Sequence, residues 1–162
     1  DLVVETVRRL HASGCRVHLD LLGDGPLRDQ LEVASDGLPI TFHGHVGDRE
    51  SVAHHLREAD VALAPGPSET FGLAALEALA SGTPVVVPTT GALPELITPG
   101  VGLVAEPTPA SFAGAVRRVL TWDRDRVRRE ARTYAERFSW DVTSESMLRL
   151  FDRVRSDERA AA

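Results

Sequence analysis

Two glutamates eight residues apart frame the most apolar segment of the chain. Between Thr70 and Pro94 the only charged residue is Glu77, and Glu69 stands just before this segment. A carboxylate buried without donors is costly, and the positions one helical turn from Glu77 hold no basic residue. Two interpretations stay open: Glu77 faces water on an amphipathic helix, or the hydroxyl groups of a ligand donate hydrogen bonds to it.

The residues between the two glutamates predict a site for an anion. At a rise of about 1.5 Å per residue, Glu69 and Glu77 lie about 12 Å apart, too far to act as an acid–base pair on one bond. Free amides and the positive dipole end of the helix that starts here favour a phosphate. Gly72 would let a ligand approach the backbone closely. A diol, a diphosphate and a second diol in a row outline a nucleotide-sugar.

Helices and strands that alternate along the chain predict the framework for these residues. The apolar strands predict a parallel sheet with both faces covered, an α/β Rossmann-like doubly wound fold. Ligands bind beyond the carboxyl ends of such strands, which points to the loops 23–26, 44–47, 65–72 and 88–93. Strands are expected at 16–22, 40–44, 61–64, 84–87 and 101–105. Helices are expected at 1–13, 26–35, 49–59, 71–80, 109–121 and 124–137, with a last one from 139 or 141 to about 155.

Composition excludes several classes of protein. The 162 residues suit one domain, 1–162, and 43% apolar residues suffice for a core. The net charge of −6 argues against a nucleic-acid partner. The single cysteine, Cys15, cannot form an internal disulfide, and no apolar run is long enough for a membrane span. We therefore expect a cytoplasmic protein, with the inner face of the membrane as a further possible location.

The segment around the glutamates resembles a known family. The run ETFGLAALEALASGTPVV, which begins at Glu69, is similar to the E-x7-E signature of retaining glycosyltransferases of family 4. LGDGPL at 22–27, ITFHGHV at 40–46, DVALAP at 60–65 and FSW at 138–140 resemble further segments of that family in the same order. The resemblance covers almost the whole chain. It implies the nucleotide-binding C-terminal domain of a two-domain GT-B enzyme.

The resemblance implies roles for particular residues. Glu69 would be the catalytic-site residue that hydrogen-bonds the donor sugar, and Glu77 would accept hydrogen bonds from the ribose hydroxyls. The amides of Phe71 and Gly72 would face the sugar, and that of Leu73 the diphosphate. The remaining implied positions belong to the nucleotide: Gly23 and Gly25 would let the first loop approach it, and the backbone at His45 and Val46 would border the base.

The resemblance also implies what else the reaction needs. No cofactor and no metal are expected; the donor is a nucleoside-diphosphate sugar. The sequence of the segment 64–86 is most similar to that of actinobacterial mannosyltransferases, which makes GDP-mannose the first candidate for the donor. The acceptor, a sugar or a lipid, would bind an N-terminal domain that this sequence lacks, as it lacks the first strand of the present domain. We therefore expect weak donor binding and no turnover from this chain alone.

One departure from the family pattern concerns charge. The basic Arg/Lys pair that holds the diphosphate in the family has no counterpart here, since Arg16 and Arg28 are misplaced for that role. Two other functions stay open: a sugar-nucleotide epimerase, for which no acid–base residues are evident, and a non-catalytic nucleotide-sugar binding module.

Weaker motifs point elsewhere. GDGPLR at 23–28 lacks the third glycine of a dinucleotide-binding fingerprint. His43 and His45 could share a strand face near His54 and His55, yet a metal site would require a carboxylate or cysteine at a fixed spacing. Ser68 lacks the glycines of a nucleophile elbow, and Glu95 is as consistent with a helix start as with a cleft.

Overall fold

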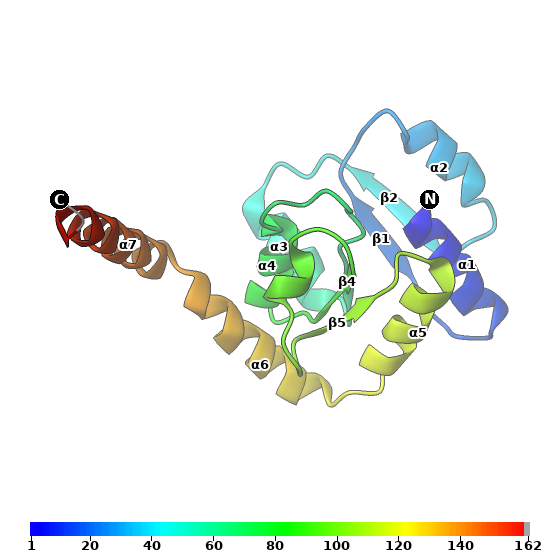
Figure 1. Ribbon diagram of the computed structural model, residues 1–162. Coiled ribbons are helices and arrows are strands. Elements are labelled where there is room, and N and C mark those ends of the chain that lie inside the picture. Colours follow the sequence, from blue (N-terminus) through cyan, green and yellow to red (C-terminus); the bar gives the residue numbers. More distant parts are fainter. Residues whose placement is uncertain (161–162) are drawn as a thin grey trace.

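The computed structural model describes the backbone of residues 1–160 and the side-chain surroundings of residues 1–156. Helices and strands alternate through the first two thirds of the chain, as the sequence predicts (Figure 1). The order is α1 (Leu2–Ala12), β1 (Leu19–Leu22), α2 (Arg28–Ala34), β2 (Ile40–Gly44), α3 (Arg49–Glu58), β3 (Ala62–Leu63), α4 (Leu73–Ala80), β4 (Val85–Pro88), the 3-10 helix η1 (Leu93–Leu96), β5 (Gly102–Ala105), α5 (Pro109–Val119), α6 (Arg124–Ala135), η2 (Glu136–Phe138) and α7 (Trp140–Ala160).

All described strand pairs are parallel, but they form two hydrogen-bonded sheets. β1 pairs with β2, and β3, β4 and β5 form a second sheet in that order. The prediction of a parallel α/β fold is confirmed, whereas a single continuous sheet is not observed. Within the residues described, no strand bridges β1 and β3.

The central strand β4 shows why the fold has helices on both faces. Its residues Val85–Pro88 are all buried. Val85 and Val87 pack in a core with residues of α4, η1 and α6, whereas Val86 packs in a second core with residues of α1 and α5. Because alternate residues of a strand point to opposite faces, an unbroken apolar run in β4 requires cover on both sides. Figure 1 shows α1 and α5 on one side and α3 and α4 on the other.

Arginines of α6 hold the carboxyl ends of two neighbouring helices. Arg132 donates to the carbonyl oxygen of Ala80 at the end of α4, at 2.7 Å. Arg128 donates to the carbonyl oxygens of Arg57 and Ala59 at the end of α3. A cation at this end of a helix interacts favourably with its dipole and with its unpaired carbonyls. α4, which carries the predicted site, is thereby fixed against α6.

Helix starts were predicted correctly where a capping side chain exists. Asp48 caps α3 by accepting hydrogen bonds from the hydroxyl and amide of Ser51 and the amide of Glu50, and these bonds lower its pKa. The predicted start of α2 at Pro26 is wrong. Pro26 lies in a turn closed by the bond from the Arg28 amide to the Gly25 carbonyl, so the helix begins at Arg28.

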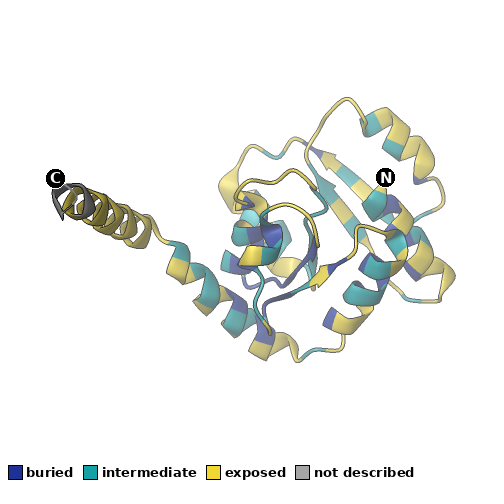
Figure 2. Cartoon of the chain, viewed as in Figure 1, coloured by how far each residue is buried: buried dark blue, intermediate teal, exposed yellow. Residues whose placement is uncertain are grey.

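The last helix lies apart from the two cores. α7 extends away from the rest of the chain and is exposed along its described length (Figure 2). The apolar residues that the sequence places on one side, Val142, Met147, Leu150, Phe151 and Val154, are all exposed. Among the described residues, no helix combines the length and apolar character that a bilayer crossing requires.

Candidate functional site

The amino end of α4 is shaped by a glycine that no other residue replaces easily. Gly72 has a φ of +83° and precedes the first helical residue, Leu73. A Cβ at Gly72 would lie 2.4 Å from Cδ2 of Leu93. This conformation ends the loop abruptly, so α4 starts at Leu73 and the predicted start at Phe71 is wrong by two residues. Among the described residues, no side chain caps this end, which leaves first-turn amides for a ligand or water.

The loop that carries Glu69 is fixed to the loop after β4. The carbonyl oxygen of Glu69 accepts a hydrogen bond from the amide of Ala92 at 3.2 Å. Gly91 has a φ of +76°, and a Cβ there would lie 2.9 Å from the carbonyl oxygen of Pro67. Two of the predicted ligand loops, 65–72 and 88–93, therefore lie in contact at the carboxyl ends of β3 and β4.

Glu77 lies on the exposed face of α4. Ala75, Ala78 and Leu79 form the buried face of the helix. Glu77 shares the exposed face with Leu73, whose exposed fraction is 65%, because residues four apart meet on one side of a helix. Among the side chains that the structure describes, none forms an ion pair or hydrogen bond with the carboxylate of Glu77. The carboxylate is thus accessible rather than buried, and it lies beside exposed apolar surface.

Glu69 and Phe71 extend this exposed surface to the start of the helix. Both residues are exposed, and Phe71 has an exposed fraction of 51%. Exposed apolar side chains gathered with polar groups are typical of interaction sites. The amino end of α4 therefore combines open amides, two accessible carboxylates and uncovered apolar side chains, which suits an elongated ligand that carries hydroxyl and phosphate groups.

The loops after β1 and β2 also meet. The amide of Gly23 donates to the carbonyl oxygen of Gly44 at 2.7 Å, and the two glycines form an antiparallel bridge. Both have positive φ values, +127° and +69°. The chain then continues to His45, which is exposed with its ring against Gly47, and to the half-buried Val46. The structure thus brings the two loops that carry Gly23, Gly25, His45 and Val46 to one edge of the fold. Their contact with a nucleotide stays a prediction.

Arg28 contributes to this edge in a way that the sequence did not reveal. A Cβ on Gly44 would lie 2.9 Å from Nη1 of Arg28, so the guanidinium lies against the end of β2. It donates to Glu32 at 2.8 Å and to Asp24 at 3.5 Å. The hydrogen bond to Glu32, more than the pairing with Asp24, raises the pKa of Arg28. This cation is therefore already engaged by two carboxylates.

Gly25 offers a test of how close a ligand comes to the first loop. Its φ is not positive, and an added Cβ would meet no atom within 4 Å. Gly25→Ala should therefore leave the melting temperature almost unchanged. If the nucleotide contacts this backbone, the methyl group should weaken nucleoside-diphosphate affinity about fivefold or more, since overpacking costs about 1–3 kcal/mol. Isothermal titration calorimetry with the wild type as control checks this, and an unchanged affinity would remove Gly25 from the site.

The histidines are arranged differently from the sequence prediction. His43 and His45 are not neighbours in one group: His43 faces Asp20 and His55, and His45 lies over Gly47. Asp20 supplies the carboxylate whose absence from the motif argued against a metal site. Sequence reasoning missed it because only the parallel pairing of β1 with β2 brings the two residues together.

One pocket lies away from these loops. Asp60, Pro84, Trp122 and Arg124 are among its lining residues. Asp60 and Pro84 precede β3 and β4, so the pocket is at the amino ends of these strands. Ligands of doubly wound sheets bind at the opposite edge, where the loops described above lie.

The fold and these loops define the class of the protein: an α/β Rossmann-like domain of the kind that forms the C-terminal half of GT-B glycosyltransferases. A solved structure of sucrose-phosphate synthase from Thermosynechococcus elongatus superposes with a TM-score of 0.75 at 26% identity, over 95% of this chain and 42% of that one. Residues 1–121 match the family described as glycosyl transferases group 1. The chain belongs to this family.

Two relatives are similar to this chain over most of its length. A GDP-mannose-dependent alpha-(1-6)-phosphatidylinositol dimannoside mannosyltransferase of Mycobacterium tuberculosis is 48% identical over 91% of this chain and 39% of its own length. A D-inositol 3-phosphate glycosyltransferase of Geodermatophilus obscurus is 43% identical over 70% of this chain and 25% of its own length. The chain therefore spans less than half the length of these relatives.

Proposed function

We propose that this chain is the donor-binding domain of a glycosyltransferase that transfers a sugar from a nucleoside diphosphate to an acceptor with retention of the anomeric configuration. The amino end of α4, open and flanked by two accessible carboxylates, is the observation that carries the proposal. Membership of the glycosyl transferases group 1 supports it. The relatives named above are transferases, which favours sugar transfer over the epimerase alternative.

In the proposed complex the ligand lies along the exposed face of α4. The amide of Leu73 binds the diphosphate, where the helix dipole adds to its attraction, and the amides of Phe71 and Gly72 face the sugar. Glu77, one turn further along, accepts hydrogen bonds from the ribose hydroxyls, and Glu69 accepts them from the sugar at the other end. The base then points toward His45 and Val46, which lie at the same edge of the fold.

The proposed chemistry requires little covalent help from the protein. We propose that the two carboxylates position the ligand and do not act as a paired acid and base on one glycosidic bond, since Glu69 lies in the loop before α4 and Glu77 lies about 6 Å along the helix from Leu73. The domain instead stabilises the departing diphosphate by preorganised amides, and an oxygen of that leaving diphosphate takes the proton of the acceptor. No cofactor and no metal enter this step.

The gap between the two hydrogen-bonded sheets supports the proposal that this sequence lacks one strand of the domain. In the doubly wound order 3-2-1-4-5-6, β2 and β1 correspond to the first two positions and β3, β4 and β5 to the last three. The remaining position falls between β1 and β3. We assign it to a parallel strand that leads into α1 from a part of the protein outside this sequence. The acceptor, a sugar or a lipid, binds a further domain.

The donor can be identified by its effect on stability. Because the M. tuberculosis relative is named as GDP-mannose-dependent, GDP-mannose is the proposed donor. A ligand at 100 times its Kd stabilises the native state by about 2.7 kcal/mol, so GDP-mannose should raise the melting temperature more than UDP-, ADP- or other GDP-sugars do. Sugar transfer by the two-domain protein, with NMR assignment of the product anomer, then tests the reaction. No shift with any nucleotide-sugar would contradict donor binding.

Glu69→Gln separates the sugar contact from the nucleotide contact. Glu69 precedes the helix, and Glu77 is the carboxylate proposed to hold the ribose. The substitution should therefore leave the affinity for GDP within about twofold of wild type, while the preference for GDP-mannose over GDP-glucose falls by about tenfold, the equivalent of one lost hydrogen bond. Competition calorimetry with the three ligands measures both quantities. A loss of GDP affinity as large as that of the sugar preference would contradict this division of roles.

A further inference from the structure

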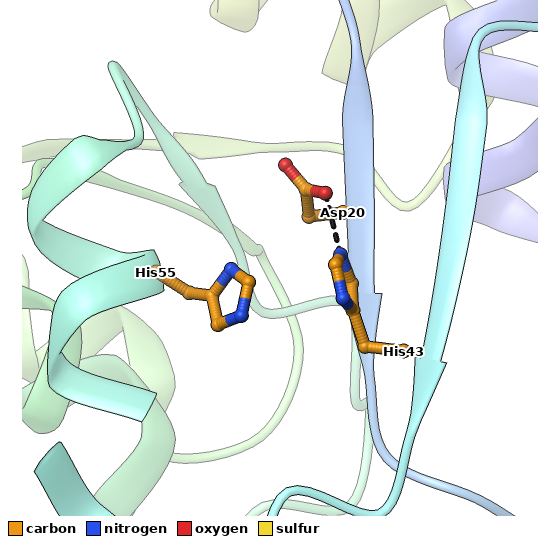
Figure 3. A group of neighbouring side chains, drawn as sticks. All are labelled: Asp20, His43 and His55. Carbon is orange, nitrogen blue, oxygen red and sulfur yellow. Dashed lines mark hydrogen bonds and ion pairs between the residues drawn. The ribbon is translucent and has the colours of Figure 1, made fainter. Parts of the chain in front are cut away.

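A second cluster of side chains lies outside the proposed donor site, on the face of the β1–β2 pair that is turned toward α3 (Figure 3). It consists of Asp20 on β1, His43 on β2 and His55 in the last turn of α3. Figure 3 shows the three side chains converging from these three elements. Each offers one ligand atom, and the three atoms all lie within 4.8 Å of one another.

The backbone of β2 directs His43 into this cluster. Leu21 pairs with Phe42, but the next residue, Leu22, pairs with Gly44, so His43 is an extra residue at a β-bulge. Bulges are frequent next to functional sites. Because Asp20 pairs with Thr41 and His43 lies two residues beyond Thr41, the side chains of Asp20 and His43 point to the same face, and His43 Nε2 lies 2.6 Å from Oδ1 of Asp20.

The third group, His55, is available for a ligand. Its ring lies against the ring of His43, with centroids 4.5 Å apart and planes inclined by 57°. Among the described residues, no group forms a hydrogen bond with the ring nitrogens of His55. An imidazole that faces a carboxylate and a second imidazole, with its own nitrogens unpaired, is arranged as a metal ligand is.

We propose that Asp20, His43 and His55 bind a divalent transition-metal ion, with Zn²⁺ as the best match. Two imidazole nitrogens and one carboxylate oxygen suit Zn²⁺, Co²⁺ or Ni²⁺, whereas Ca²⁺ and Mg²⁺ prefer oxygen ligands throughout. A tetrahedral Zn²⁺ with ligand bonds of about 2.0–2.2 Å holds its ligand atoms about 3.3–3.6 Å apart. The observed separations, 2.6 Å between His43 and Asp20 and at most 4.8 Å within the group, lie on either side of this spacing, and water would complete the fourth position.

Neighbouring groups support the ligands from outside. His18 Nε2 lies 2.9 Å from the hydroxyl of Thr41 and 3.8 Å from Oδ1 of Asp20. Such outer groups orient the ligands of metal sites. The exposed fractions of the Asp20 and His43 side chains, 46% and 26%, leave a path for the ion. A bound ion would tie β1, β2 and α3 together just before Gly44 and the loop to His45, and this role is independent of the proposed donor chemistry.

Titration of the metal-free, tag-free protein with Co²⁺ and Zn²⁺ tests the proposal. Co²⁺ should bind with a stoichiometry of one and produce visible ligand-field absorption that Zn²⁺ displaces. Asp20→Asn, His43→Gln and His55→Gln should each weaken binding by about tenfold or more, since the loss of even an outer-shell partner costs about 10- to 100-fold in metal affinity. His54→Gln is the matched control on the same helix, since His54 contacts Arg57 instead, and it should bind Co²⁺ as the wild type does.

A second measurement uses the unmodified protein, so its result does not depend on whether the variants fold. In ¹⁵N NMR spectra of the imidazoles, one equivalent of Zn²⁺ should shift the signals of His43 and His55 and leave those of His45 and His54 in place. Zn²⁺ that leaves the His43 and His55 signals unchanged, or Co²⁺ affinity that is the same in wild type and all three variants, would overturn the site.

Discussion

Glu77→Ala is expected to weaken nucleoside-diphosphate binding by about 10- to 150-fold. The carboxylate of Glu77 is accessible and unpaired among the described residues, so the proposed ribose hydroxyls are its only strong partners. Hydrogen bonds to a charged group contribute about 1.5–3 kcal/mol, and about 1.4 kcal/mol corresponds to a tenfold change in Kd. The fold should not suffer, because alanine is a good helix former and the residue lies on the exposed face of α4. Calorimetric titration with GDP and UDP measures the effect.

Two control variants make this result specific. Glu77→Gln retains the shape but loses the charge, so its affinity should fall between those of wild type and Glu77→Ala. Asp125→Ala removes an exposed carboxylate from the first turn of α6, and it should leave nucleotide affinity unchanged. Equal affinities of wild type and Glu77→Ala for both nucleotides would count decisively against the ribose contact.

Gly72→Ala should destabilise the fold by about 2–5 kcal/mol. An alanine at a φ of +83° is strained by about 1–2 kcal/mol. Its methyl group would also stand 2.4 Å from Leu93 and 3.1 Å from Leu96, both buried in the core, and overpacking adds about 1–3 kcal/mol. Although Gly72 lies at the end of a helix, it is buried, and it is thus expected to behave like a core residue. Urea unfolding followed by circular dichroism measures the difference.

Gly114→Ala provides the matched control within the same protein. Gly114 lies inside α5 with an ordinary φ, and an added Cβ would meet no atom within 4 Å. Alanine is favoured over glycine in a helix interior by about 0.5–1 kcal/mol, so this variant should be slightly more stable than wild type. A Gly72→Ala protein as stable as Gly114→Ala would show that α4 does not begin in the described conformation.

Local signals in the sequence were sufficient for most of the framework. The unbroken run of Val85–Val87 predicted a buried strand, and the carboxylate of Asp48 predicted the start of α3. The failures arose where tertiary contacts override local preference. Pro26 suits a first helical position, yet the turn closed by Gly25 and Arg28 delays the helix. The chain pattern likewise gives no sign that β1 and β3 lie in separate sheets.

The candidate site was predictable only in part. The loops 65–72 and 88–93 were expected at one edge because parallel strands end there, and their contact through Glu69 and Ala92 is observed. The roles of individual residues in ligand binding remain predictions. The place of Arg28 beside Gly44 and the meeting of Asp20 with His55 depend on contacts between elements far apart in the chain, and no local pattern encodes such contacts.

A crystal structure of the two-domain protein with a bound nucleoside-diphosphate sugar tests the central claim most directly. The account predicts phosphate oxygens within hydrogen-bonding distance of the first amides of α4, ribose hydroxyls on the carboxylate of Glu77 and sugar hydroxyls on that of Glu69. A donor bound at another edge of the fold, with Glu77 in open solvent and no pentose beside it, would contradict the account.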